Sequence, residues 1–113
     1  MNIKAQEFWH RVSELANKQG LLQSQIADKL GVSLNTYKGW IQHVRLPDID
    51  LGLKLADILC TSVDYLVNGN GKETRLDPDT IKIINMLESL TPEQRKPIVI
   101  LVEGQVNYWR NNS

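Results

Sequence analysis

Apolar residues recur along this chain at intervals of three and four, and this spacing constrains the fold more than any other feature. The first segment carries Ala5, Phe8, Val12, Leu15 and Ala16. This is the pattern of a helix with one buried face. No useful stretch alternates apolar and polar residues as a half-buried strand would. The sequence therefore predicts an all-α fold.

Residues that end and start helices divide this pattern into short helices. Gly20 and Gly31 each follow an apolar periodic segment, where a left-handed glycine commonly ends a helix. Ser33, Asp48 and Ser62 each precede another such segment and can accept hydrogen bonds from its free N–H groups. We therefore predict helices over residues 4–19 and 23–30, and a further helix after each of the three caps.

The chain changes character after Asn68, since residues 70–77 are polar and turn-rich, as is typical of a linker. Asp77-Pro78 and Thr91-Pro92 each combine an N-cap with proline at the first helical position. Pro97 would remove a hydrogen bond from an unbroken last helix, so we expect a kink or a restart there. The predicted organisation is a domain at residues 1–69, a linker at 70–77 and two helices within 78–113.

Composition excludes several classes of function. The 13 Lys and Arg residues balance 13 Asp and Glu residues, so nucleic-acid binding would require a local basic surface. Cys60 is the single cysteine, which excludes an internal disulfide. It also lies apart from both histidines in the sequence, so we expect no metal site. We find no catalytic constellation and expect neither a cofactor nor an enzyme. Lacking a membrane-spanning apolar run and a signal peptide, the chain is expected to be soluble and cytoplasmic, with no membrane partner.

The segment from Gln23 to Trp40 has the spacing of two short helices that cross over a tight turn. Ala27 is small where the helices would cross most closely, and Gly31 can take the positive φ of the turn. Larger apolar residues are placed to lock the angle between the helices, namely Ile26, Leu30, Val32, Tyr37 and Trp40. This arrangement would hold the second helix with its polar side chains facing outward.

In this ordered series the chain resembles the lambda-repressor and Cro-like family of helix-turn-helix regulators, often called Xre-like, over residues 5–69. The resemblance is carried by Gly20-Leu21-Leu22-Gln23, Ile26-Ala27-Asp28-Lys29-Leu30-Gly31-Val32-Ser33, Thr36-Tyr37-Lys38-Gly39-Trp40, Pro47, Leu55-Ala56-Asp57-Ile58-Leu59 and Ser62-Val63-Asp64-Tyr65-Leu66-Val67-Asn68-Gly69. It implies a five-helix bundle whose third helix enters the DNA major groove.

The chain departs from the family pattern at a few positions. Leu22 stands where the family usually has threonine, so the helix at 23–30 is expected to lose a side-chain cap worth about 1 kcal/mol, unless Leu22 is packed instead. Ile41 and His43 replace the usual acidic residue and glycine after the tryptophan, and Gly52 replaces a preferred leucine.

The outward side of the third helix supplies the candidate DNA-binding residues. Asparagine can pair with adenine, lysine with guanine, and leucine can contact a thymine methyl, so Asn35, Lys38 and Leu34 are the predicted base readers. The resemblance implies that Gln23 lies against a phosphate or braces the first base-reading residue. The complete predicted set is Gln23, Ser33, Leu34, Asn35, Thr36, Lys38, Gly39, Gln42, His43 and Arg45. The alternative is that these residues form an ordinary solvated helix face.

The C-terminal segment carries more apolar surface than a small domain can hide. Residues 98–102 are apolar on every side of a helix, and the preceding helix, with Ile81 to Leu90, is expected to cover one side as a helical hairpin. The remaining surface predicts a homodimer contact formed by Ile98, Leu101, Val102, Val106 and Trp109. Two alternatives are that residues 78–110 pack back on the first domain, or that they dock another protein.

The leading hypothesis is a sequence-specific transcriptional regulator, most simply a dimeric repressor that reads a palindromic double-stranded operator with its third helix. The alternative is a protein-interaction module, such as an antitoxin or the target of an antirepressor, in which DNA binding is secondary.

Overall fold

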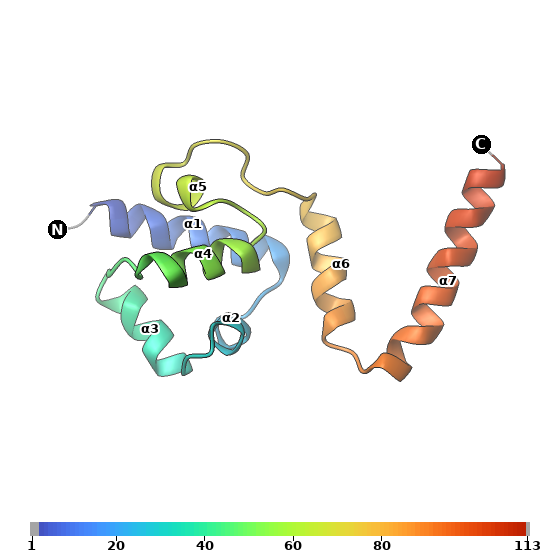
Figure 1. The fold of residues 1–113 in the computed structure, drawn as a ribbon, viewed down its shortest axis with the longest axis horizontal. Helices are drawn as coiled ribbons and strands as arrows, with labels where there is room; N and C mark the ends of the chain where they lie inside the picture. The colour runs from blue at the N-terminus through green and yellow to red at the C-terminus, as the bar shows by residue number, and fades with distance from the viewer. Residues whose placement is uncertain (1–2, 113) are drawn as a thin grey trace. The chain divides into compact units, whose positions relative to one another are not determined.

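The computed structural model describes residues 3–112, and within this range the chain forms seven helices and no strand (Figure 1). The all-α prediction is therefore confirmed. The helices are α1 (Ile3–Gln19), α2 (Gln23–Leu30), α3 (Leu34–Gln42), α4 (Ile49–Ile58), α5 (Val63–Asn68), α6 (Pro78–Glu88) and α7 (Pro92–Asn111). The chain divides into two compact units, and the boundary falls within α6, between Lys82 and Ile83.

Helices α1 to α5, which we call the bundle, enclose one hydrophobic core. Helix α1 packs on α5, and α2 packs on α3 and α4. The predicted one-sided stripe of α1 is buried, with Phe8, Val12 and Leu15 each 1% exposed. Leu59 and Leu66 at the ends of α4 and α5 are fully covered. Burial of these side chains is the main stabilising contribution to the bundle, at about 1.5–3 kcal/mol for each large one.

Polar side chains of α1 also tie the bundle together. Arg11 donates from Nη1 to the carbonyl oxygens of Leu66 and Val67, at 3.1 and 3.0 Å, which are acceptors left free at the end of α5. Gln19 is 1% exposed and donates from Nε2 to the carbonyl oxygen of Leu59 at 2.7 Å. These bonds fix α1 against the ends of α4 and α5.

The predicted helix ends are confirmed. Ser33, Asp48 and Ser62 each accept a hydrogen bond from a backbone N–H in the following turn, at 3.1, 2.9 and 3.0 Å. Gly20 and Gly31 have left-handed φ values of 68° and 75°. Local capping chemistry therefore determines where these helices begin and end.

The start of α2 lacks the side-chain cap that a threonine would give. The Oε1 atom of Gln25 accepts a hydrogen bond from the backbone N–H of Leu22 at 2.8 Å, which supplies one half of a capping box. The Leu22 side chain is 65% exposed. The alternative that Leu22 is packed is therefore wrong.

The segment expected to be a linker is held to the first unit. The backbone N–H of Arg75 donates to the carbonyl oxygen of Cys60 at 2.7 Å, and Lys18 pairs with Glu73. At the start of α6, Ile81 is only 2% exposed. The first compact unit consequently extends to Lys82, beyond the end of the bundle.

The second unit consists of the end of α6 and the whole of α7. Helix α7 starts with the predicted capping box, in which Thr91 and Gln94 exchange side-chain and backbone hydrogen bonds at 3.0 and 3.2 Å. The helix continues through Pro97 to Asn111, so the expected restart at Pro97 does not occur. The proline sits soon after the capped start and removes only the bond to the Glu93 carbonyl, and the capping box supports the turn before it.

Helix α7 buries none of its residues. Ile100 is 67% exposed and Leu101 72%, while Ile83 and Met86 in the last part of α6 are 57% and 61% exposed. The predicted closed hairpin, in which one helix covers a side of the other, is therefore not observed in this unit. No helix within residues 3–112 combines the length and apolar character needed to cross a membrane.

Candidate nucleic-acid interface

The turn between α2 and α3 is fixed by backbone hydrogen bonds. Gly31 takes a left-handed conformation, and its N–H donates to the Asp28 carbonyl at 3.0 Å. The N–H of Val32 donates to the Ala27 carbonyl, also at 3.0 Å. Ser33 then caps α3. The start of α3 is thus held in a single orientation at the end of α2.

Aromatic side chains lock the inner side of α3. Tyr37 is 1% exposed, and its ring meets Trp9 edge to face with the ring centroids 5.6 Å apart. The Tyr37 ring also meets Trp40, with the ring centroids 6.3 Å apart. Edge-to-face pairs of this kind add about 0.5–1.5 kcal/mol to the burial of the rings. Helix α3 therefore has a rigid inner side, on which Ile41 is half-buried.

The opposite side of α3 is polar and accessible. Asn35, Lys38 and Gln42 are exposed and share one face because they are three and four residues apart. Leu34 and Gly39 border this face and are half-buried. The structure thus brings together the predicted base readers and places them away from the core.

Ser33 and Thr36 lie beside this face, but both hydroxyl groups are engaged in the cap. Ser33 Oγ donates to Thr36 Oγ1 at 2.8 Å and accepts from the Thr36 N–H at 3.1 Å. These residues fix the start of α3, and because Thr36 Oγ1 is the acceptor in this bond its own O–H remains free to donate.

The loop after α3 carries His43 and Arg45, both exposed. His43 has φ −88°, so its replacement of the family glycine causes no strain at that position. The left-handed residue is instead Val44, with φ 51°. A β-branched residue in this conformation is unusual and strained.

Trp9 holds this loop in place, a role that the sequence analysis missed. Its indole N–H donates to the carbonyl oxygen of Arg45 at 2.7 Å, across 36 residues of sequence. The backbone N–H of Arg45 also donates to the Trp40 carbonyl at 2.9 Å. A buried indole N–H needs an acceptor, which was the available signal, but its identity depends on the tertiary fold.

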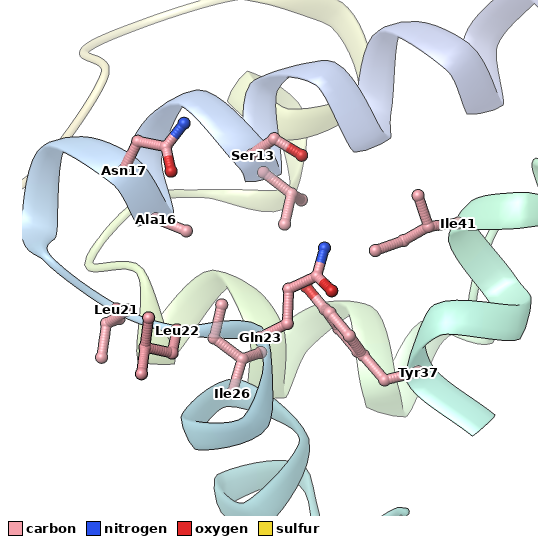
Figure 2. A pocket seen from close by; sticks show the side chains of 10 residues that line it. Ser13, Ala16, Asn17, Leu21, Leu22, Gln23, Ile26, Tyr37 and Ile41 are labelled. Atoms are coloured by element: carbon pink, nitrogen blue, oxygen red, sulfur yellow. The ribbon is translucent and has the colours of Figure 1, made fainter. Parts of the chain in front are cut away.

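Gln23 begins α2, and its side chain points into a cleft between α1 and α3 (Figure 2). The residue is exposed overall. Its position at the helix N-terminus is compatible with a phosphate contact by the backbone, since first-turn N–H groups attract anions.

The local charge around this surface is positive. Residues 29–45 contain Lys29, Lys38 and Arg45 and no acidic residue, although the whole chain has no net charge. Acidic residues are concentrated elsewhere, with Asp48, Asp50, Asp57 and Asp64 in the region 48–64. No group of His, Cys, Asp and Glu that could hold a metal ion occurs among the residues described.

An exposed polar helix held at a fixed angle by a glycine turn, with positive charge around it, is the arrangement of a helix-turn-helix DNA-binding protein. The helix-turn-helix family HTH_3 matches residues 12–66. This region contains the end of α1, all of α2 to α4 and most of α5.

Three similar proteins are regulators. The cryptic phage CTXphi transcriptional repressor RstR of Vibrio cholerae is 28% identical over 97 residues, covering 86% of this chain and 86% of that protein. The HTH-type transcriptional regulator ImmR of Bacillus subtilis (strain 168) is 32% identical over 76 residues, covering 66% of this chain and 60% of that protein. The crystal structure of a transcriptional regulator from Listeria innocua shares 30% identity over 86% of this chain and 90% of that one, with a TM-score of 0.49.

Through residues 12–66 the chain belongs to the lambda-repressor and Cro-like helix-turn-helix family. It is a DNA-binding transcriptional regulator and not an enzyme.

Proposed function

We propose that this protein is a dimeric repressor that reads the major groove of a palindromic operator with α3. The observation that carries the proposal is the polar, exposed face of α3 over its locked aromatic base. A similar protein, RstR, is named a repressor, which favours repression over activation here. Repression would follow from occlusion of a promoter by the bound dimer.

Base recognition is assigned to Asn35, Lys38 and Leu34. Asn35 would pair with N6 and N7 of adenine, Lys38 would donate to O6 and N7 of guanine, and Leu34 would contact a thymine methyl. Each well-placed contact contributes about 1–3 kcal/mol of discrimination between bases. Gly39 lies on the same face, and the absence of a side chain there lets the DNA approach the helix closely.

Contacts to the DNA backbone are assigned to Gln42, His43 and Arg45 at the end of α3, and to Gln23 at the start of α2. Ser33 and Thr36 would support the readers through the cap that they form. With so few cations, each subunit would neutralise about two to four phosphates, giving a shallow salt dependence.

Dimerisation is assigned to α7, within the predicted C-terminal segment at residues 78–113. Five apolar residues recur along one side of the helix, and four of them are exposed: Ile98 (37%), Leu101 (72%), Val102 (55%) and Trp109 (61%), while Val106 is half-buried. A second copy offers the same stripe, so a twofold arrangement would bury both at once. Two α3 helices about 34 Å apart would then require half-sites about one DNA turn apart.

The first experiment is selection of bound duplexes from a random pool by the full chain, followed by sequencing. We expect an inverted repeat with half-site centres about 10–11 base pairs apart. A single unsymmetric half-site would contradict the twofold proposal. No enrichment at all would favour the protein-interaction alternative, for which the exposed apolar surface of α7 is the supporting observation.

Substitutions test the assigned readers. Asn35→Ala with Lys38→Ala should lower affinity for the selected duplex by about 10- to 1,000-fold, corresponding to 1–3 kcal/mol per lost contact and partial additivity. Affinity for unrelated DNA should change little. The matched control is Lys54→Ala with Asn107→Ala, which removes the same side-chain types from exposed positions in α4 and α7. Unchanged sequence preference in the double variant of α3 would contradict the assignment of Asn35 and Lys38 as base readers.

The assigned dimer contact can be tested separately from DNA binding. Leu101→Lys places a charge in the apolar stripe and should convert a dimer to a monomer in analytical ultracentrifugation. Asn107→Lys adds the same charge to an exposed position on the other side of α7 and should leave the dimer intact. A dimer that survives Leu101→Lys would show that another surface joins the subunits.

A further inference from the structure

A cleft of about 300 Å³ opens between α1, α2 and α3. Figure 2 shows side chains from all three helices around it. Its polar lining residues are Ser13 and Asn17 from α1, Gln23 from α2 and Tyr37 from α3, and its apolar lining includes Ile26 and Ile41. The cleft thus lies within the helix-turn-helix domain and touches both of its defining helices.

The Tyr37 hydroxyl is the most informative group in the cleft. The residue is 1% exposed, and its hydroxyl points into the cleft (Figure 2). No hydrogen bond of this hydroxyl to residues 3–112 is observed. Burial raises the pKa of Tyr37 to about 12, so the phenol is neutral and can both donate and accept. The hydroxyl faces the open cleft and is not enclosed by the protein, so a ligand there can accept from it or donate to it.

The neighbouring polar groups are also available to a ligand. The side chains of Ser13, Asn17 and Gln23 make no hydrogen bond to other residues of the described range. Together with Tyr37 they offer two amides and two hydroxyls beside an apolar wall. This combination of an apolar surface with a few convergent polar groups is typical of a small-molecule site.

Charge and size narrow the class of ligand. None of the 10 residues that line the cleft carries a charge, so an ionic ligand would be desolvated without a counter-charge. By comparison with the 150 Å³ cavity that binds benzene, the volume has room for roughly ten to fifteen non-hydrogen atoms. The site therefore fits a small neutral molecule with an apolar body and one amide or hydroxyl group.

We propose that this cleft is an effector site for such a molecule, and that its occupation weakens DNA binding. The second part rests on the proposed function, in which Gln23 contacts a phosphate. The Gln23 side chain reaches into the cleft, so a ligand bonded to its amide would keep that side chain from turning out to join the backbone N–H in the phosphate contact. A ligand that binds only the DNA-free state lowers the DNA affinity by mass action.

Binding is tested first without DNA, so that it does not depend on the proposed function. The full ¹⁵N-labelled chain is titrated with benzamide as the probe, and with benzoate, toluene and inorganic phosphate as matched probes. We expect saturable shifts with benzamide at the amides of Ser13, Gln23 and Tyr37, and at least fivefold weaker binding of toluene and benzoate. Saturation by phosphate in place of benzamide would identify an anion subsite and overturn the proposal, as would the absence of saturable shifts.

Variants identify the groups responsible. Tyr37→Phe keeps the ring and should weaken benzamide binding about fivefold or more, whereas Tyr108→Phe on α7 should have no effect. Ser13→Leu removes a hydroxyl at an exposed position and fills the cleft, so it should abolish binding even if Tyr37→Phe alters the core. Full binding by a folded Ser13→Leu protein would overturn the site.

The regulatory part is then measured with the selected duplex. Saturating benzamide should raise the Kd for that duplex at least threefold, and the Ser13→Leu variant should not respond. Benzamide binding with no change in DNA affinity would overturn the regulatory part and leave the ligand site established. Failure to select any duplex contradicts the proposed function and has no bearing on the NMR result.

Discussion

The bundle and helix α7 use apolar residues in opposite ways. The bundle buries large side chains of α1, α4 and α5 to within 1% of complete coverage, among them Phe8, Leu55 and Leu66. Helix α7 carries the densest apolar run of the chain, at residues 98–102, and buries none of its residues. Apolar content alone therefore does not predict an internal core.

The pattern of the apolar residues explains this difference. On α1 they form one stripe, with charged residues around the rest of the helix, so a single neighbouring surface can cover it. On α7 they surround the helix at residues 98–102, which no single small neighbour can cover. Within residues 3–112 this helix is supported by its own caps rather than by a core, and we expect its stability to respond differently from that of the bundle.

The largest predicted difference in stability between the bundle and α7 is that between Phe8→Ala and Leu101→Ala. Phe8 is 1% exposed and contacts Trp9 edge to face, so its truncation should lower the free energy of unfolding by about 3–5 kcal/mol. Leu101→Ala at a 72% exposed site should change it by less than about 0.5 kcal/mol in the monomer. Urea denaturation followed by circular dichroism, at concentrations at which the chain is monomeric, measures both changes in the free energy of unfolding. Equal losses would contradict the distinction between core and exposed helix.

Much of the bundle could be predicted from sequence because its helix ends depend on local chemistry. The caps at Ser33, Asp48 and Ser62 and the left-handed glycines at 20 and 31 need only neighbouring residues to act. The polar face of α3 was predictable for a similar reason, since three- and four-residue spacing places side chains on one face.

The features that sequence analysis missed depend on contacts between distant residues. Nothing near Trp9 indicates that its indole binds the carbonyl of Arg45. The attachment of the expected linker through Arg75 and Cys60 is equally non-local. At Pro97, a general rule about helix interiors predicted a kink or a restart, and the restart is wrong because the helix continues from its capping box at Thr91 through the proline.

Pro97→Ala should stabilise α7 and leave the bundle unchanged. The substitution restores an N–H donor for the Glu93 carbonyl and removes the clash of the proline ring, for a local gain of up to about 3 kcal/mol. Amide hydrogen exchange should show greater protection at residues 96–102 and unchanged protection in α1. Unchanged exchange along α7 would indicate that its stability is not determined within the helix.

Alkaline pH should destabilise the bundle through Tyr37. Its pKa is about 12 in the folded protein, raised by burial from 10. Below pH 10 the phenol is protonated in both states and the stability is complete. Between pH 10 and 12 only the unfolded chain loses the proton, so the free energy of unfolding should fall by roughly 2–3 kcal/mol. Urea titrations at several pH values measure this fall.

Tyr37→Phe should remove this part of the alkaline fall, because it leaves no buried phenol to ionise. Tyr108→Phe, at a site that is 62% exposed, is the control for loss of a phenol. This variant should still lose stability between pH 10 and 12. If Tyr37→Phe leaves the slope between pH 10 and 12 unchanged, the burial of this hydroxyl does not govern the pH dependence.

The smallest effects should come from two glycines inside helices, Gly52 in α4 and Gly104 in α7. An added Cβ has no neighbour within 4 Å at either position, so alanine should fit and favour the helix by about 0.5–1 kcal/mol. In the bundle this gain should appear as a higher urea midpoint. In α7 it should appear as greater exchange protection near residue 104 with the midpoint unchanged. If Gly104→Ala raised the urea midpoint as much as Gly52→Ala, α7 would unfold together with the bundle. The bundle and α7 would then differ in how they bury their apolar side chains but would share one stability.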